Sequence, residues 1–179
     1  RLTGNATKVH AGEYNISFGI TPDELMDMLV AGKVVQHSFN IVEGWNLQQV
    51  LAALKNNKEI THSLVAKDAK KIMQELAIDK QHAEGWFFPD TYCFVPHTSH
   101  KVLLKRAYIE MQSLLDAQWQ ERDADVPYSN AYEALIMASI IEKETGLASE
   151  RQQISGVFKR RLEKRMRLQT DPTVIYGIG

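Results

Sequence analysis

Cysteine, long apolar runs and net charge are all scarce in this chain of 179 residues. A single Cys93 excludes an internal disulfide and a cysteine-based zinc site. The longest apolar stretch, 134–141, holds eight residues, whereas a membrane span needs about 20. Arg1 is followed by no signal-peptide pattern. A formal net charge of −1 argues against a dedicated nucleic-acid binder.

The composition is that of a folded globular domain. Hydrophobic residues make up 44% of the chain and charged residues 24%, which excludes disordered and fibrous classes. The length fits one domain, or one domain with a small appendage, and such a chain needs no metal to fold. The six histidines show no metal-ligand spacing and there is no glycine-rich phosphate loop, so no metal or other cofactor is expected.

The chain divides into a small mixed segment and a mostly helical remainder, so the expected fold class is α+β. Over 12–42 the pattern predicts a strand at 13–18, a helix capped by Thr21, and a strand at 34–42. The remainder shows helical spacing of apolar residues. Helices are expected to start at Asn46 and Asp68, to span 100–120, and to span 131–144 with Asn130 as the cap. A capping box of Ser149 and Gln152 is expected to open the last helix.

The first candidate for chemistry is 138–146, where an apolar helix runs into Glu142-Lys143-Glu144 and ends at Gly146. A helix that is apolar on most sides is buried, so its last turn would emerge from the core. A carboxyl group among apolar side chains keeps its proton to higher pH, as a general acid requires. Spacing alone does not choose between Glu142 and Glu144, and two solvated glutamates at a helix end are the alternative.

The second candidate is 84–92, which holds four aromatic residues interrupted by Gly85 and Pro89. Aromatic faces stack on sugar rings, while Asp and Thr bond to hydroxyl groups. The alternative is a loop pinned to the core by Trp86 and Phe88.

The third candidate is 168–177, in which Gln169, Thr170 and Asp171 precede a proline. Such a sequence predicts a tight polar turn that could orient a polyhydroxylated ligand, or an ordinary Asp-Pro turn.

The fourth candidate is a basic stretch, 151–167, whose seven basic residues and one acidic residue give a net charge of +6. It could bind phosphate, an anionic glycan or lipid headgroups, or be a solvated helix face. Binding of nucleic acid is disfavoured because aromatic residues are not interleaved with the cations.

Four stretches taken together resemble the YceG-like endolytic murein (peptidoglycan) transglycosylases. They occur in the family's order and at similar spacing across most of the chain. The matching stretches are Val42-Glu43-Gly44, Glu84-Gly85-Trp86-Phe87-Phe88-Pro89-Asp90-Thr91, Ala138-Ser139-Ile140-Ile141-Glu142-Lys143-Glu144-Thr145 and Leu168-Gln169-Thr170-Asp171-Pro172-Thr173-Val174-Ile175-Tyr176-Gly177.

The resemblance implies a lyase that cleaves MurNAc–GlcNAc bonds within peptidoglycan strands and leaves 1,6-anhydro-MurNAc ends. It implies a bacterial inner-membrane protein with one N-terminal anchor and a periplasmic catalytic part, working beside cell-wall synthases. Residues 1–42 would be part of a LysM-like subdomain, and 43–179 the catalytic domain. The family continues beyond the Tyr-Gly of the last stretch, so that domain is expected to be C-terminally incomplete.

The resemblance also assigns the family's catalytic glutamate, the second of Glu-Lys-Glu, to Glu144. We expect Glu142 to be structural. The expected sugar-binding residues are Gln169, Thr170, Asp171, Glu84, Phe88 and Tyr92. Two alternatives stay open: a non-catalytic peptidoglycan-binding module, and a glycoside hydrolase in which Asp171 or Glu84 is a second carboxylate.

Overall fold

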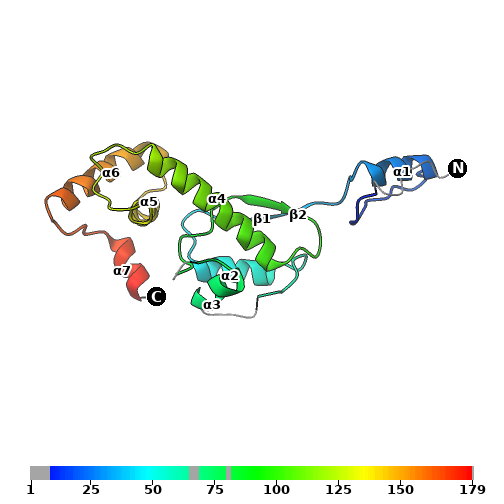
Figure 1. Ribbon diagram of the computed structural model, residues 1–179, viewed down its shortest axis with the longest axis horizontal. Coiled ribbons are helices and arrows are strands. Elements are labelled where there is room, and N and C mark those ends of the chain that lie inside the picture. The colour runs from blue at the N-terminus through cyan, green and yellow to red at the C-terminus, as the bar shows by residue number, and fades with distance from the viewer. Residues whose placement is uncertain (1–8, 65–68, 80–81, 179) are drawn as a thin grey trace.

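The computed structural model describes residues 9–64, 69–79 and 82–178 and has an α+β architecture (Figure 1). Most of the described residues lie in helices, and a two-stranded antiparallel sheet completes the fold. The elements in chain order are α1 Pro22–Val30, β1 His37–Asn40, α2 Leu47–Asn56, α3 Ala69–Glu75, β2 Thr91–Phe94, α4 His100–Gln120, α5 Ala131–Glu144, α6 Ala148–Glu163 and α7 Asp171–Ile178. Within the described ranges, no helix is both long and apolar enough to cross a bilayer.

The N-terminal segment differs from its prediction. Thr21 caps α1 in the predicted capping box with Glu24. The predicted strand over 13–18 is wrong, because those residues have no regular structure. Alternation of apolar residues makes a strand only where a partner strand accepts its hydrogen bonds. Of the predicted strand at 34–42, only β1 forms, and its partner is β2, with Phe39 opposite Tyr92.

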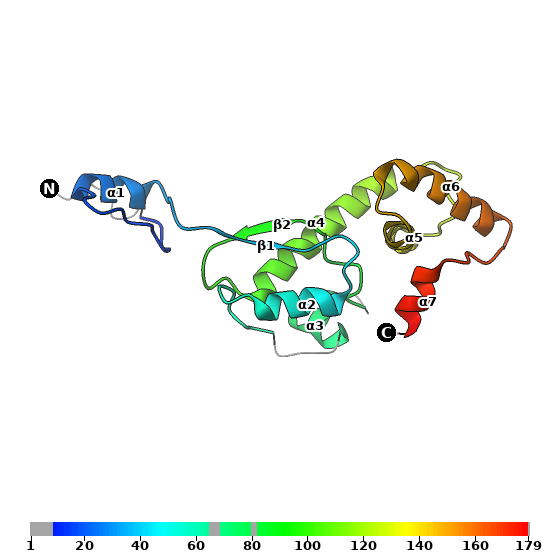
Figure 2. The same ribbon diagram turned by 180° about the vertical axis from the view of Figure 1, so that it is seen from behind.

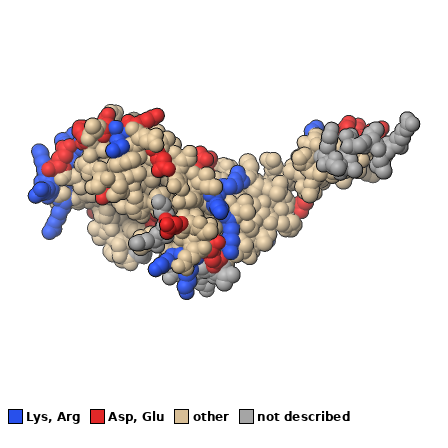
Figure 3. All heavy atoms as spheres, in the orientation of Figure 1, with Lys and Arg blue, Asp and Glu red and all other residues tan. Residues whose placement is uncertain are grey.

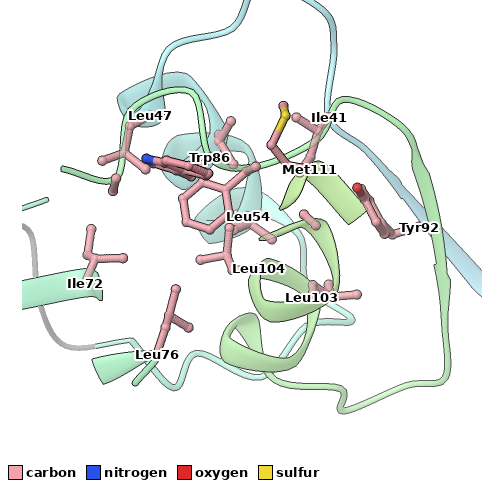
Figure 4. Close-up of a cluster of buried hydrophobic side chains, with 14 of the residues drawn as sticks. Ile41, Leu47, Leu54, Ile72, Leu76, Trp86, Tyr92, Leu103, Leu104 and Met111 are labelled. Carbon is pink, nitrogen blue, oxygen red and sulfur yellow. The ribbon is translucent and has the colours of Figure 1, made fainter. Parts of the chain in front are cut away.

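The core lies between the sheet and helices α2, α3 and α4. Figure 4 shows Leu54, Ile72 and Leu104 pointing toward one another from three different helices. All three side chains are 0% exposed. Trp86 and Phe87 enter this core from the loop before β2, so that loop is fixed by apolar burial.

Helices α5, α6 and α7 form a second group at the end of the long helix α4. Figures 1 and 2 agree that α1 lies far from this group, beyond an extended segment that leads into β1. Asn46 and Asn130 cap α2 and α5 as predicted. The predicted helix start at Asp68 lies outside the described residues.

The start of α6 corrects another prediction. This helix begins after Leu147, without a hydrogen bond from a capping side chain, so the predicted capping box of Ser149 and Gln152 is wrong. Thr145 takes over part of this role. Its hydroxyl donates to Glu150 Oε2 at 2.6 Å and accepts from the Leu147 amide at 3.0 Å.

Leu104→Ala tests whether the α2–α3–α4 cluster carries the stability of the chain. Truncating a fully buried leucine leaves a cavity and should lower the free energy of unfolding by about 2–5 kcal/mol. The matched control on the same helix is Val102→Ala, at a side chain that is 50% exposed, which should cost less than about 0.5 kcal/mol. Denaturant titration measures both. Equal losses would contradict this account of the core.

Candidate functional site

Glu144 ends α5 and its side chain is exposed. The prediction of a helix buried on most sides is wrong, since Met137 is the one buried residue of α5 and Ile136 is 44% exposed. The apolar stretch of this helix is shared between several neighbours, because α5 contacts α4, α6 and α7 without being enclosed by them. The carboxyl group of Glu144 therefore faces water in the free chain.

Thr170 holds this carboxyl group in place. Its hydroxyl donates a hydrogen bond of 2.6 Å to Glu144 Oε2, across 26 positions of sequence. Thr170 itself is only 3% exposed. A buried, short side chain has little rotational freedom, so the bond fixes the position of an otherwise mobile glutamate.

The residues around Thr170 form a helix start rather than the predicted tight polar turn. Asp171 and Pro172 are the first residues of α7, and Thr173 Oγ1 donates to the Thr170 carbonyl at 2.8 Å. Proline suits this position because its missing N–H has no helical partner there. Gln169 precedes it with a φ of +53°, an uncommon conformation for a residue with a side chain.

The other glutamate of the motif has a different environment. Glu142 Oε2 lies 2.9 Å from Arg151 of α6, in an ion pair that ties α5 to α6. This contact favours a structural role for Glu142. Spacing in the sequence could not separate the two glutamates, because it contains no information about the facing helix.

The turn at 42–45 reaches the same end of α5. A Cβ added to Gly44 would lie 3.1 Å from Lys143 Cε, so the backbone of the turn is packed against the Lys143 side chain. The φ of Gly44 is +73°, which favours glycine. Of the four stretches that carry the family resemblance, three (42–44, 138–145 and 168–177) therefore meet around Lys143, Glu144 and Thr170.

The fourth stretch, 84–92, docks elsewhere on α5. Trp86 stacks on Tyr132 with ring centroids 5.3 Å apart, and Gly85 lies beside Leu135. Leu135 and Glu144 are nine helical residues apart, or roughly 13 Å at 1.5 Å per residue. The aromatic loop and the glutamate thus lie toward opposite ends of one helix. No pattern in the sequence indicated the Trp86–Tyr132 pair.

Most side chains expected of this loop are engaged within the protein. Both carboxylate oxygens of Glu84 accept from the Leu47 amide, at 3.1 and 3.3 Å. Tyr92 is 6% exposed and its hydroxyl donates to the Phe88 carbonyl at 2.7 Å. Phe88 is half-buried against the core. Their contact with a sugar stays a prediction.

Helix α7 connects the two places. It begins at Thr170–Asp171 beside Glu144, and Tyr176 lies near Glu84 and Tyr132. Burial, followed by the negative charge of Glu84, raises the pKa of Tyr176. Two surface hollows, one against α1 at Phe18 and one beside Cys93, are not lined by Glu144. The candidate site is therefore described by its residues, exposed Glu144 at the end of α5 and buried Thr170 before α7.

The fold and the site together define a mostly helical α+β protein whose candidate acid–base group is one exposed carboxyl positioned by a buried threonine. The sequence profile of the YceG-like family matches residues 1–179. The chain belongs to this family.

Curated relatives and a solved structure agree with this membership. The chain is 29% identical over 192 residues to the endolytic murein transglycosylase of Bacillus subtilis, with 97% of this chain and 53% of the relative covered. It is 26% identical to the endolytic murein transglycosylase of Streptococcus pneumoniae, with 98% and 36% covered. The chain thus spans about half of these relatives, or less.

The structural match is to the crystal structure of a YceG-like protein from Listeria monocytogenes. The TM-score is 0.59 at 26% identity, with 98% of this chain and 63% of that chain covered.

Gly44→Ala tests the packing of the 42–45 turn on Lys143. A side chain at φ +73° is strained, and the added methyl group also meets Lys143, so the free energy of unfolding should fall by about 1–2 kcal/mol. Gly146, two residues after Glu144, has open space around its Cβ position. Gly146→Ala should change stability by about 0.5 kcal/mol or less. Thermal and denaturant unfolding compare the two, and equal effects would argue against the packed turn.

Proposed function

We propose that this chain is the catalytic part of an endolytic peptidoglycan lytic transglycosylase. It cleaves MurNAc–GlcNAc bonds within glycan strands and leaves 1,6-anhydro-MurNAc ends, with Glu144 as the single acid and base. The names of the curated relatives support the reaction class. The observation that carries the assignment to Glu144 is its hydrogen bond from buried Thr170.

One carboxyl group is enough for both halves of this reaction. Protonated Glu144 donates its proton to the glycosidic oxygen as the bond to C1 of MurNAc breaks. The resulting carboxylate then takes the proton of the C6 hydroxyl, whose oxygen bonds to C1. No water is consumed, and Glu144 ends in its starting state. Acid–base catalysis of this kind contributes about 10²–10⁴-fold, and the intramolecular nucleophile adds the advantage of proximity.

Thr170 suits both protonation states of Glu144. A hydroxyl group both donates and accepts, so it donates to the carboxylate, as found here, and accepts from the protonated acid. The bond therefore persists through the cycle. A glycan bound over the exposed carboxyl displaces water, and exclusion of water favours the neutral form of an acid. Gln169 and Asp171, on either side of Thr170, are the residues that we propose bind sugar hydroxyls at this point.

The two-carboxylate alternative depends on the distance between the partners. Glycosidases hold their two carboxyl groups about 5–9.5 Å apart. Both carboxylate oxygens of Glu84 already accept from the Leu47 amide, at 3.1 and 3.3 Å, which disfavours Glu84 as the partner. Asp171 adjoins Thr170 and is the better partner for a hydrolase. Mass spectrometry separates the reactions, because the anhydro product is lighter by one water than a hydrolysis product.

The setting of the protein follows from the same proposal. Its peptidoglycan substrate lies outside the cytoplasm, and we propose a single-pass anchor in the bacterial inner membrane with the catalytic part in the periplasm. Residues 1–42 are proposed to belong to a LysM-like subdomain, with 43–179 as the catalytic part. Cell-wall synthases are proposed partners. A binding module without catalysis would retain glycan strands without shortening them.

Glu144→Gln should abolish cleavage, with a loss of at least about 10²–10⁴-fold, because an amide has nearly the same shape but cannot donate and retake the proton. The matched control is Glu142→Gln, which weakens the ion pair with Arg151 and should cost far less activity. Purified glycan strands are incubated with a protein of the full length of the relatives, and anhydro ends are counted. Undiminished anhydro product from Glu144→Gln would refute the assignment.

Thr170→Val should slow cleavage by up to about 10²-fold, because the isosteric side chain no longer holds the acid in position. Thr170→Ser keeps the hydroxyl and should retain most of the activity. The loss should appear in kcat more than in KM, because the Thr170 side chain is only 3% exposed and adds little to the surface that would meet the glycan. Single-turnover kinetics on defined strands measures both, and equal activities of the Val and Ser variants would show that the hydroxyl is dispensable.

A further inference from the structure

A group of exposed cations lies at the C-terminal end of α6. Arg160 is in its last turn, and Lys164, Arg165 and Arg167 follow in the loop toward Thr170. We name these four residues the α6 basic cluster. Figure 3 shows Lys and Arg side chains gathered at the end of the molecule where α6 ends in Figure 1.

Among the described residues the cluster has no acidic partner, unlike Arg151 and Lys159 of the same helix. Arg151 pairs with Glu142, and Lys159 pairs with Asp125 and Glu163. In the part of the chain that the structure describes, the four cations of the cluster form no ion pair. Their charges are therefore available to an external anion.

The backbone keeps an arginine where glycine is the usual residue. Arg165 N–H donates to the Leu162 carbonyl at 2.9 Å, and Met166 N–H donates to the Arg161 carbonyl at 2.8 Å. This pair of bonds is the Schellman motif, whose left-handed position is most often glycine. Arg165 occupies it with a φ of +53°. An arginine in this strained left-handed position points to a role for its side chain.

The loop is also tied to the candidate site. The Arg161 guanidinium donates to the Leu168 carbonyl, and Leu168 is two residues before Thr170. Arg167 is three residues from Thr170, so their Cα atoms are at most about 11 Å apart. A ligand at Glu144 that carries anionic branches can therefore reach the cluster.

We propose that the α6 basic cluster binds the carboxylates of the peptide stems that branch from the glycan strand at Glu144. This inference rests on the proposed function and extends it from the sugar to its peptide substituent. Each MurNAc carries its stem through its lactyl group, and the stem bears free carboxylates. Arg binds carboxylates through paired hydrogen bonds with charge assistance.

A membrane surface is the rival source of anions, and the composition of the loop disfavours it. Interfacial segments combine cations with Trp, Phe or Leu that enter the acyl boundary. Between Lys164 and Arg167 the large apolar residue is Met166 alone, 52% exposed. Residues 164–167 therefore offer positive charge to an acidic peptide but no Trp, Phe or Leu that could anchor them in a membrane.

Binding to intact and stripped glycan strands tests the proposal. Strands with peptide stems, and strands whose stems an amidase has removed, are titrated at low salt onto Glu144→Gln protein, which prevents turnover. We expect stem-bearing strands to bind roughly tenfold tighter, and the difference to disappear in Lys164→Gln/Arg165→Gln/Arg167→Gln. The matched control, Lys55→Gln/Lys58→Gln/Lys105→Gln, removes three exposed charges elsewhere and should retain it.

Arg165→Gly separates recognition from structure. Glycine relieves the left-handed strain, so the thermal midpoint should rise while the preference for stem-bearing strands falls. A higher midpoint with unchanged preference would overturn the role of Arg165.

Two further outcomes decide the matter. If the protein with its cluster intact binds both kinds of strand equally, the proposal is overturned. It is also overturned if the triple variant loses binding to anionic phosphatidylglycerol vesicles while neither protein prefers stem-bearing strands. If the protein without substitutions binds stem-bearing strands preferentially but does not cleave them, the proposed reaction is refuted and this inference stands.

Discussion

The hydrogen bond from Thr170 to Glu144 is the contact on which the arrangement of the candidate site depends. It joins the last residue of α5 to the residue before α7, and so determines where α7 begins. Helix α7 has no buried residue of its own, so apolar burial does little to hold it. A polar contact with a buried donor therefore does the positioning that packing does in the core. The same contact orients the exposed carboxyl group and anchors the helix beside it.

The core supports this contact from a distance. Leu54, Ile72 and Leu104 fix α2, α3 and α4, and Trp86 carries that order to α5 by stacking on Tyr132. Because α5 is one continuous helix, its end at Glu144 inherits the position of its start. The aromatic loop thus acts on the site through α5, even though it lies roughly 13 Å away along the helix. Its sequence resembles a sugar-binding wall partly because rigid docking uses the same aromatic side chains.

Local signals in the sequence were sufficient for helix starts and insufficient for partners. Thr21, Asn46 and Asn130 cap helices as predicted, because a capping side chain and the backbone amide that donates to it are three positions apart. The strand at 13–18 and the burial of α5 were mispredicted, because both depend on neighbours remote in sequence. Asp171-Pro172 fits a turn and a first helical turn equally well. Pairing of Glu142 with Arg151, and of Glu144 with Thr170, likewise required the three-dimensional structure.

Backbone strain in the segment between α6 and α7 links the α6 basic cluster to the candidate site. Arg165 and Gln169 both have a φ of +53°, on either side of Arg167. Two residues with side chains in the left-handed region within five positions are a cost that glycine would remove. One of these two residues, Arg165, belongs to the basic cluster, and the other, Gln169, sets the backbone direction immediately before Thr170. The segment that presents the cations is therefore the segment that delivers the donor to Glu144, and a change in one alters the other through the shared backbone.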